Sequence, residues 1–252
     1  MAAKEYHCEV KGFRMITPTV FETTFETHEP VIFEAGQFIS IVIPGAGPKG
    51  RDLRRAYSIA SAPETRPVEL CVKLVGEGPG TNYLYQLRPG DKFRGYAAYG
   101  DFTYEHKAGR NACFISTGTG IAPFRSMVLS EAFKANPPKH TWCLLGVREE
   151  NELLYVEELS QLKGIEFVPT VSRPTSSEWK GFKGRVTDFL RAQEATFPWL
   201  ETEFYLCGSG AMIDEMKLLL AGKGVERESV HQEVYYKPPK DAVTAVPATT
   251  TS

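Results

Sequence analysis

The pattern of apolar residues changes once along the chain, and this change limits the kind of fold that the chain can form. Up to about Lys107, short apolar stretches alternate with Gly, Pro and Asp, which is typical of antiparallel strands in a small barrel or sandwich. These stretches are Tyr6–Met15, Val20–Thr24, Gln37–Ile43, Ala56–Ser61, Val68–Leu74 and Lys92–Arg94. The first part of the chain is therefore predicted to be an antiparallel β-barrel.

From Asn111 onward, strands alternate with amphipathic helices. The predicted pairs are Ala112–Ser116 with Ala122–Lys134, Thr141–Val147 with Glu152–Lys163, Glu166–Ser172 with Val186–Gln193, and Glu203–Cys207 with Met212–Gly222, followed by a last strand at Val230–Tyr236. This alternation indicates βαβ units around a parallel sheet, whose ligands bind at the carboxyl ends of the strands.

Two domains and a tail follow from these patterns. We expect an antiparallel β-barrel domain over residues 1–107, an α/β parallel-sheet domain over 108–236, and a flexible tail over 237–252. The tail is small, polar and rich in proline, so it cannot bury enough surface to offset the entropy of ordering. A length of 252 residues suits two medium domains.

Charge and cysteine content exclude several classes of protein. Lys and Arg number 29 against 31 Asp and Glu, so there is no basic excess for binding nucleic acid. The 5 cysteines are scattered and never in a CxxC or CxxxxC spacing, which argues against a disulfide framework, a metal site or an iron–sulfur cluster. No apolar run is long enough to span a membrane, and no signal peptide is apparent. We expect a cytoplasmic protein that is a monomer.

The strongest local motif is the loop Ser116-Thr-Gly-Thr-Gly-Ile-Ala-Pro-Phe124, between a predicted strand and a predicted helix. Gly118 and Gly120 would let the backbone approach a pyrophosphate, and Pro123 suits a first helical turn with free N–H groups. The spacing is G-x-G-x-x-P, which does not match the Rossmann fingerprint. Taken alone, the loop fits a dinucleotide phosphate cradle or a tight strand-to-helix turn.

Three further segments carry side chains or glycines suited to a cofactor. Arg55-Ala-Tyr-Ser58 places a cation and an aromatic ring on one face of a predicted strand, where they can bind a phosphate and stack on a flat heterocycle. Gly78-Pro-Gly-Thr81 opens a short predicted helix, Asn82–Leu87, that can hold a phosphate. Cys207-Gly-Ser-Gly-Ala-Met212 ends a parallel strand. Taken singly, these segments also fit a surface arginine, a turn and a packed cysteine.

Together and in this order, the segments resemble the ferredoxin–NADP reductase family over about residues 6–236. The resemblance implies that FAD binds the barrel domain, that NADP(H) binds the parallel-sheet domain, and that hydride passes between them at the domain interface.

The resemblance also implies roles for particular residues. Arg55 would bind the flavin pyrophosphate, Tyr57 would stack on the isoalloxazine, and the hydroxyl of Ser58 would lie near the flavin N5. The other residues implied to bind FAD are Ala56, Cys71, Val72, Lys73, Gly78, Gly80 and Thr81. Those implied to bind the NADP pyrophosphate are Thr117, Gly118, Thr119, Gly120 and Pro123, and Cys207 with Gly208 would lie beside the nicotinamide.

The last predicted strand, Gln232-Glu-Val-Tyr235, resembles a plant-type ending in which a Glu assists electron and proton traffic and an aromatic residue covers the flavin. The implied catalytic residues are therefore Ser58, Cys207, Glu233 and Tyr235. Because the chain continues past Tyr235, both Tyr235 and Tyr236 are candidates for the covering aromatic.

Arginines near the ends of two strands indicate the choice of nicotinamide nucleotide. NADP carries a 2′-phosphate that needs cations near the adenosine ribose. Arg148, Ser172, Arg173 and Arg185 match positions that bind this phosphate in bacterial members of the family, so NADP(H) is the predicted nucleotide. Arginines are also common in surface loops, which is the alternative explanation.

These inferences predict a flavin-dependent NADPH oxidoreductase that passes single electrons to a separate ferredoxin or flavodoxin. The alternatives are the reductase component of an oxygenase, an enzyme that uses NADH, or a flavin electron-transfer subunit without turnover of its own. The acceptor is expected to be a separate molecule, because the cysteine spacing does not fit a fused ferredoxin. Four basic residues are expected to steer an acidic partner electrostatically: Lys49, Arg51, Arg54 and Lys73.

Overall fold

The first sheet closes on itself because its two edge strands meet. A computed structural model describes residues 4–236, with the side chains of residues 4–234, and the predicted tail at 237–252 lies outside the described residues. The strands are β1 (Lys4–Thr17), β2 (Val20–Thr27), β3 (Phe38–Ile43), β4 (Leu53–Ser58), β5 (Val68–Lys73) and β6 (Lys92–Tyr99), in the order β4-β3-β6-β1-β2-β5. An antiparallel bridge between Ile59 and Leu70 joins β4 to β5 at the edges.

The interior of this barrel is filled by alternate residues of each strand. Its buried members include Val10, Phe21, Phe25, Ile39, Ile41, Leu70 and Phe93. Helix α1 (Pro79–Gln86) adds the fully buried Leu84 to this core. The short 3-10 helix η1 (Pro48–Gly50) lies between β3 and β4.

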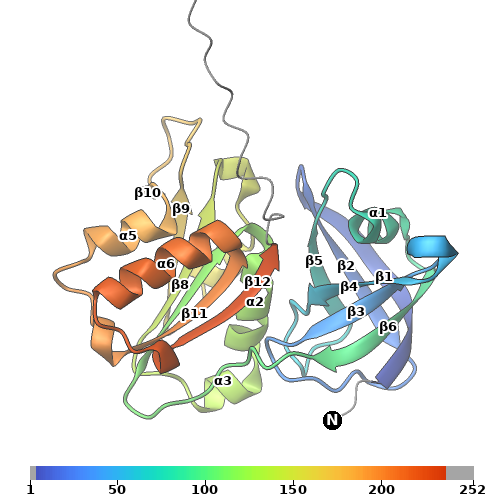
Figure 1. Ribbon diagram of the computed structural model, residues 1–252, viewed down its shortest axis with the longest axis horizontal. Helices are drawn as coiled ribbons and strands as arrows, with labels where there is room; N and C mark the ends of the chain where they lie inside the picture. Colours follow the sequence, from blue (N-terminus) through green and yellow to red (C-terminus); the bar gives the residue numbers. More distant parts are fainter. Residues whose placement is uncertain (1–3, 237–252) are drawn as a thin grey trace, which may run out of the picture.

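The second sheet is parallel throughout and carries helices on both faces (Figure 1). Its strands are β7 (Asn111–Thr117), β8 (Thr141–Val147), β9 (Ile165–Val171), β10 (Phe182–Lys183), β11 (Thr202–Ser209) and β12 (Val230–Tyr236), in the order β10-β9-β8-β7-β11-β12. The order reverses at β7, so the carboxyl ends of β7 and β11 form the switch point where ligands bind in such sheets.

The residues of each strand alternate between the two faces. Phe114 and Tyr205 pack on the face of helices α2 (Ile121–Leu129), α3 (Glu131–Ala135) and α4 (Val156–Ser160). Ile115 and Leu206 pack on the opposite face, under α5 (Val186–Ala192) and α6 (Gly210–Gly222). The remaining 3-10 helices are η2 (Gly118–Gly120), η3 (Glu150–Glu152), η4 (Trp199–Glu201) and η5 (Arg227–Ser229). Among the described residues, none of these helices combines the length and apolar character needed to cross a membrane.

The architecture confirms the predicted antiparallel barrel followed by a parallel α/β sheet, but two predicted helices were wrong in detail. The helix expected over Ala122–Lys134 breaks at Ser130, whose hydroxyl accepts the Phe133 N–H at 3.2 Å and caps α3. The helix expected over Glu152–Lys163 is reduced to α4, because Tyr155 takes a left-handed conformation with φ 55° immediately before it. The two-residue strand β10 was not predicted.

The two domains are joined through the side chain of Arg125 on α2, which is only 7% exposed. Its guanidinium donates to the Ala60 carbonyl at 2.9 Å, pairs with Glu69 of the barrel, and binds Glu158 of α4 in a bidentate manner at 2.6 and 3.0 Å. The ring of Tyr155 lies under it, 4.5 Å from centroid to guanidinium carbon. Arg125 therefore binds acidic groups of both domains at once.

A second buried contact lies beside the first. The hydroxyl of Tyr155 donates to the Glu22 carboxylate on β2 at 3.2 Å, and Arg14 binds the same carboxylate at 2.7 and 3.1 Å. Burial raises the pKa of Tyr155 well above its usual value, so this phenol remains a donor. Ser126 adds a bond across the interface, from its hydroxyl to the Ser61 carbonyl at 2.7 Å.

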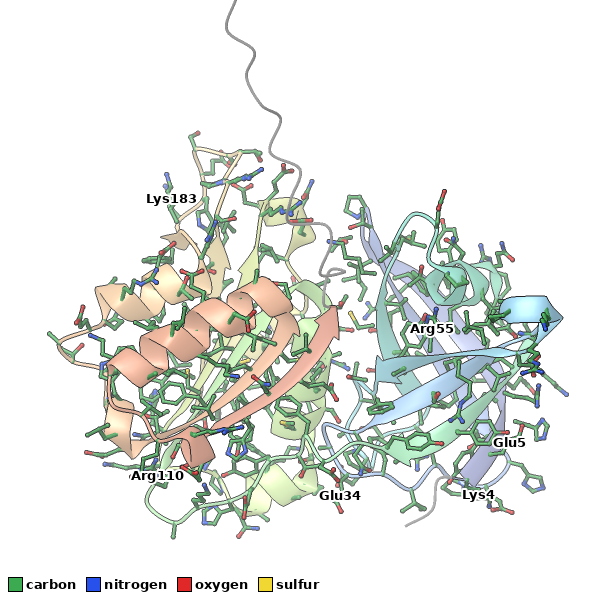
Figure 2. All side chains as sticks on the ribbon, viewed as in Figure 1. Lys4, Glu5, Glu34, Arg55, Arg110 and Lys183 are labelled. Carbon is green, nitrogen blue, oxygen red and sulfur yellow. The ribbon has the colours of Figure 1, made fainter. Side chains whose placement is uncertain are left out.

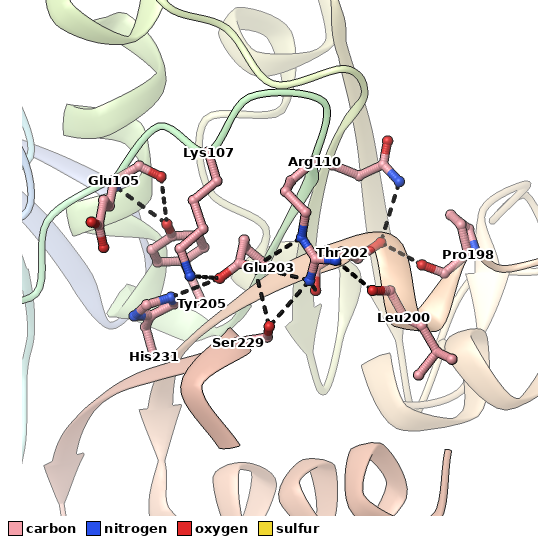
Figure 3. A network of polar contacts seen from close by, with 11 residues as sticks. Glu105, Lys107, Arg110, Pro198, Leu200, Thr202, Glu203, Tyr205, Ser229 and His231 are labelled. Carbon is pink, nitrogen blue, oxygen red and sulfur yellow. Dashed lines mark hydrogen bonds and ion pairs between the residues drawn. The ribbon is translucent and has the colours of Figure 1, made fainter. Parts of the chain in front are cut away.

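The connection between the domains is held by Glu203, which is 3% exposed (Figure 3). Its carboxylate binds Lys107 at 2.7 Å, Arg110 at 3.0 Å and His231 at 3.2 Å. Burial acts to raise the pKa of Glu203, but the hydrogen bonds from Lys107, His231 and Arg110 outweigh it and lower the pKa. The connecting segment, residues 100–110 between β6 and β7, is thus tied to the N-terminal end of β11.

We predict that Arg125→Met lowers the free energy of unfolding by about 2–3 kcal/mol, because two partly buried carboxylates lose their cation. Lys134→Met is the matched control, since Lys134 pairs with Glu131 on the surface of α3 at 2.8 Å. Its loss should change stability by less than about 0.5 kcal/mol. Chemical denaturation of both variants measures the difference, and equal effects would contradict the role of Arg125.

Candidate active site

A hydrogen bond across the domain interface marks the centre of the candidate site. Ser58, the last residue of β4, donates from its hydroxyl to a carboxylate oxygen of Glu233 on β12 at 2.9 Å. Ser58 is 6% exposed. Burial raises the pKa of Glu233, while the hydrogen bond from Ser58 acts in the opposite direction. This carboxyl therefore retains a proton to higher pH than a surface glutamate does.

Cys207 lies next to Glu233 in the sheet. The two residues pair in the parallel register of β11 and β12, and Cys207 pairs with Ser116 of β7 on its other side. The thiol side chain is fully buried. The structure thus brings Ser58, Glu233 and Cys207, three residues widely separated in sequence, to one place between the domains.

A cavity of about 300 Å³ opens beside Glu233. Its walls are formed by Asp101 and Phe102 of the connecting segment and by His231, Gln232 and Glu233 of β12. The half-buried Glu233 carboxyl is therefore close to a space that is lined by two further titratable side chains, Asp101 and His231.

Three of the predicted flavin residues, Arg55, Tyr57 and Gly80, lie together at the start of α1. Arg55 projects from β4 beside this helix (Figure 2), is exposed, and pairs with no carboxylate among the described residues. No side chain caps the N-terminus of α1. A Cβ atom on Gly80 would lie 2.4 Å from the Tyr57 hydroxyl oxygen and 2.9 Å from Arg55 Cγ, so Arg55 and Tyr57 rest directly on the helix start.

This arrangement fits an aromatic cofactor with a phosphate group. The Arg55 guanidinium, which has no carboxylate partner among the described residues, and the start of α1, which has no side-chain cap, both attract anions. The Tyr57 ring is half-buried, and burial raises its pKa to about 12, which keeps the hydroxyl neutral. Gly78 occupies the N-cap position but has no side chain to bind the helix N–H groups. The Thr81 hydroxyl donates back to the Gly78 carbonyl at 3.2 Å, and Ala56 is exposed between Arg55 and Tyr57.

The side chains of the strand segment Cys71-Val-Lys73 lie in three different surroundings. Cys71 is buried at the domain interface, and burial raises its pKa to about 12. Val72 belongs to the barrel core. The Lys73 ammonium lies 3.7 Å from the Glu152 carboxylate of the other domain, so its charge is partly matched inside the protein.

On the nucleotide side, the loop Thr117–Gly120 packs backbone to backbone against the end of β11. A Cβ atom on Gly120 would lie 2.4 Å from the Cys207 carbonyl oxygen, and one on Gly208 would lie 2.3 Å from the Thr117 hydroxyl oxygen. That hydroxyl also accepts the Ser209 N–H at 3.0 Å. Only glycine allows this close packing.

The loop leaves its backbone accessible at the helix start. Gly118 has φ 52° with open space around its Cα atom, and Thr119 is partly exposed. No side chain caps η2 or α2, and Pro123 lies in the first turn of α2, as predicted for a phosphate-binding helix start.

The predicted 2′-phosphate residues fall into two groups. Arg148 follows β8 and Ser172 with Arg173 follow β9, and the Arg173 N–H donates to the Arg148 carbonyl at 2.7 Å. Neither arginine pairs with a carboxylate in the described part of the chain. Arg185, in contrast, binds Glu215 at 3.4 Å.

Two residues of the prediction lie beyond the described side chains. The backbones of Tyr235 and Tyr236 belong to β12, and Tyr236 is in register with Ser209. Which of the two rings stacks on the flavin stays a prediction.

Sequence reasoning missed Arg125, Glu150, Tyr155 and the cavity residues Asp101 and Phe102. Arg125 had a signal, because a lone cation within the apolar run Ile121–Leu129 is buried only when it is paired. The others had none, since their partners lie far away in sequence.

Comparisons with known proteins identify the class of this site. Residues 8–104 match the oxidoreductase FAD-binding domain and residues 114–217 match the oxidoreductase NAD-binding domain. Ferredoxin–NADP reductase B of Sorangium cellulosum (strain So ce56) is 34% identical over 245 residues, which cover 92% of this chain and 98% of that protein. These matches define a flavin oxidoreductase that binds FAD and a nicotinamide nucleotide. The chain belongs to the ferredoxin–NADP reductase family, as its motifs had indicated.

A further relative and a solved structure are also similar to this chain. The reductase component of phenol 2-monooxygenase from Pseudomonas sp. (strain CF600) is 29% identical over 241 residues, and the match covers 66% of that protein. The fold is shared with a ferredoxin NADP+ reductase from Neisseria gonorrhoeae with bound FAD and NADP, at a TM-score of 0.80 and 22% identity, over 93% of this chain and 100% of the other.

We predict that Gly80→Ala weakens FAD binding about tenfold or more, because the new methyl group must displace Tyr57 or Arg55. Gly76→Ala is the matched control, since a Cβ atom there meets nothing within 4 Å. Fluorescence titration of the apoprotein with FAD gives both dissociation constants. Unchanged FAD affinity in Gly80→Ala would contradict the placement of the flavin beside α1.

Proposed function

We propose that this protein is a ferredoxin or flavodoxin–NADP+ reductase, which exchanges hydride with NADP(H) and single electrons with a separate ferredoxin or flavodoxin. The observation that carries the proposal is the hydrogen bond between Ser58 and Glu233 at 2.9 Å. In this bond a hydroxyl and a half-buried carboxyl meet between β4, which carries the predicted flavin residues, and the carboxyl end of β12. The similarity to the Sorangium protein along nearly the whole of both chains supports the same reading.

The barrel residues would bind and orient the flavin. FAD, when bound, takes up two electrons as hydride and releases them one at a time. Arg55 and the N–H groups at the start of α1 hold the pyrophosphate, and Tyr57 packs against the ring system. Ser58 donates a hydrogen bond, and Glu233 holds or passes a proton beside it.

The parallel-sheet residues would bring the nicotinamide to the same place. The N–H groups of the loop Thr117–Gly120 and the first turn of α2, including Pro123, bind the pyrophosphate. Because this loop packs on Cys207 and Gly208, a nucleotide held there extends toward Glu233 and Ser58. A capping aromatic, Tyr235 or Tyr236, yields its place to the nicotinamide.

NADP(H) is the proposed nucleotide because Arg148 and Arg173 leave neighbouring strands side by side without carboxylate partners in the described structure. Arg185 would join them after releasing Glu215, and Ser172 would add a hydroxyl.

The acceptor is proposed to dock on the cations of the barrel. Lys49 and Arg51 are exposed there, whereas the Arg54 guanidinium is held over Tyr96 at 4.2 Å, and Lys73 faces Glu152.

A second candidate function is the reductase component of an oxygenase, which the similarity to the phenol 2-monooxygenase component favours. The two candidates differ in the protein that accepts electrons.

We further propose that the protein acts as a cytoplasmic monomer with its domain boundary between residues 107 and 108.

We predict that NADPH bleaches the flavin absorbance of the purified protein under anaerobic conditions within seconds, and that NADH does so more slowly. Arg173→Ala and Arg185→Ala should each lower the NADPH to NADH ratio of kcat/KM by about tenfold or more, since each removes a cation from the 2′-phosphate. Stopped-flow absorbance measures the rates. A ratio that neither variant changes would refute the nucleotide assignment, and a preparation that does not bleach would refute turnover.

We predict that Ser58→Ala slows flavin reduction by NADPH about a hundredfold at pH 7 while FAD remains bound. The hydrogen bond from Ser58 acts to lower the pKa of Glu233, so Ser58→Ala raises that pKa further. The part of the pH profile that follows the titration of Glu233 therefore moves to higher pH. Ser58→Thr keeps the hydroxyl and is the control. Reduction rates measured across pH 5 to pH 9 test both effects, and an unshifted profile would show that the contact has no chemical role.

A further inference from the structure

The carboxylate of Glu150 anchors the loop that carries Arg173. Its two oxygens accept the Thr175 N–H, the Thr175 hydroxyl and the Ser176 N–H, each at 3.0 Å. These groups belong to the connection between β9 and β10, whereas Glu150 belongs to η3, after β8. The side chain therefore fastens one loop of the nucleotide-binding edge to another.

The same two loops are also joined through their backbones. Val147 and Val171, the last residues of β8 and β9, are in register. The ladder continues past the sheet, because the Ser172 N–H donates to the Val147 carbonyl at 3.1 Å and the Arg173 N–H donates to the Arg148 carbonyl at 2.7 Å. Arg148 and Arg173 thus leave the sheet as neighbours.

A second carboxylate completes the arrangement on the Arg148 side. Glu152 accepts the Arg148 N–H at 3.0 Å and the Glu149 N–H at 3.3 Å. Both acidic side chains are therefore directed to backbone N–H groups and bind neither guanidinium. The cations of Arg148 and Arg173 stay available for a ligand, in contrast to Arg185, which is paired with Glu215.

The hydrogen bonds to Glu150 keep its carboxyl group ionised. They lower the pKa of this carboxyl to about 2, and the Thr175 N–H contributes most. The carboxylate is thus ionised throughout the physiological range, and the anchor persists there.

We propose that Glu150 is a positioning residue for nucleotide specificity, which fixes the Arg173 loop so that Arg148 and Arg173 together receive the 2′-phosphate of the nucleotide. This inference rests on the proposed use of NADP(H). An ordered loop loses less conformational entropy when the phosphate binds, so the fixed arginines bind it more tightly than mobile ones would.

A role of Glu150 through its charge and a role through its position predict opposite effects of Glu150→Gln on binding of the 2′-phosphate. If Glu150 acted only through its charge, Glu150→Gln would remove a negative group near a phosphate site and tighten binding. If it acts by position, Glu150→Gln weakens binding, because a side-chain amide cannot accept all three hydrogen bonds.

The experiment is calorimetric titration of the FAD-loaded protein with two probes that differ only in the 2′-phosphate, adenosine 2′,5′-bisphosphate and adenosine 5′-monophosphate. Glu150→Gln is expected to weaken bisphosphate binding roughly tenfold and to leave monophosphate binding within about twofold. Glu150→Asp, which keeps a carboxylate, should restore part of the loss. Equal or tighter bisphosphate binding in Glu150→Gln would overturn the proposal.

Two controls separate the possible failures. Glu178→Gln removes one negative charge from the same connection, and the Glu178 carboxylate accepts no hydrogen bond in the described structure, so this variant should bind both probes as the parent does. Weakening in Glu178→Gln equal to that in Glu150→Gln would overturn the proposal. Arg173→Ala tests the underlying function: if it binds the bisphosphate normally, the assignment of the 2′-phosphate site fails, whatever Glu150 does.

Discussion

One buried guanidinium is central to the contact between the two domains. Arg125 on α2 binds Glu158 of its own domain and, in the barrel, Glu69 and the Ala60 carbonyl. Ala60 lies just after Ser58, and α2 begins at the nucleotide loop. The contact therefore links β4, which carries the predicted flavin residues, to the helix proposed to bind the nucleotide pyrophosphate. A buried charge of this kind is stable only while both domains supply its partners.

Close backbone contacts between the loop Thr117–Gly120 and the end of β11 fix the rest of the candidate site. Gly120 packs on the Cys207 carbonyl, and the Thr117 hydroxyl accepts the Ser209 N–H at 3.0 Å, so the loop Thr117–Gly120 is held against the end of β11. The register of β11 and β12 then places Glu233 beside Cys207, and the domain contact places Ser58 2.9 Å from Glu233. The predicted cofactor-binding residues and the hydrogen-bonded pair of Ser58 and Glu233 are thus parts of one connected structure.

How much was predictable from sequence depended on the range of the interactions. The barrel and the parallel sheet were predicted because each depends on local spacing and turn chemistry. The cofactor roles of the motif residues around Arg55, Gly80 and Gly118 stay predictions. The helix over Glu152–Lys163 was wrong because Tyr155 adopts a left-handed conformation, in which its ring lies under Arg125 and its hydroxyl reaches Glu22. No local pattern signals a tertiary contact of that kind.

By itself, the sequence determined the order of the two domains, the family, and the glycines and arginines that suit phosphates, since hydrophobic periodicity and turn residues act over a few positions. Only the tertiary structure decided which charged side chains are free to bind a ligand. Arg148 and Arg173 are left open because Glu150 and Glu152 bind backbone N–H groups, whereas Lys73 and Arg185 face carboxylates. Such pairings depend on distances between segments that meet only after the chain has folded.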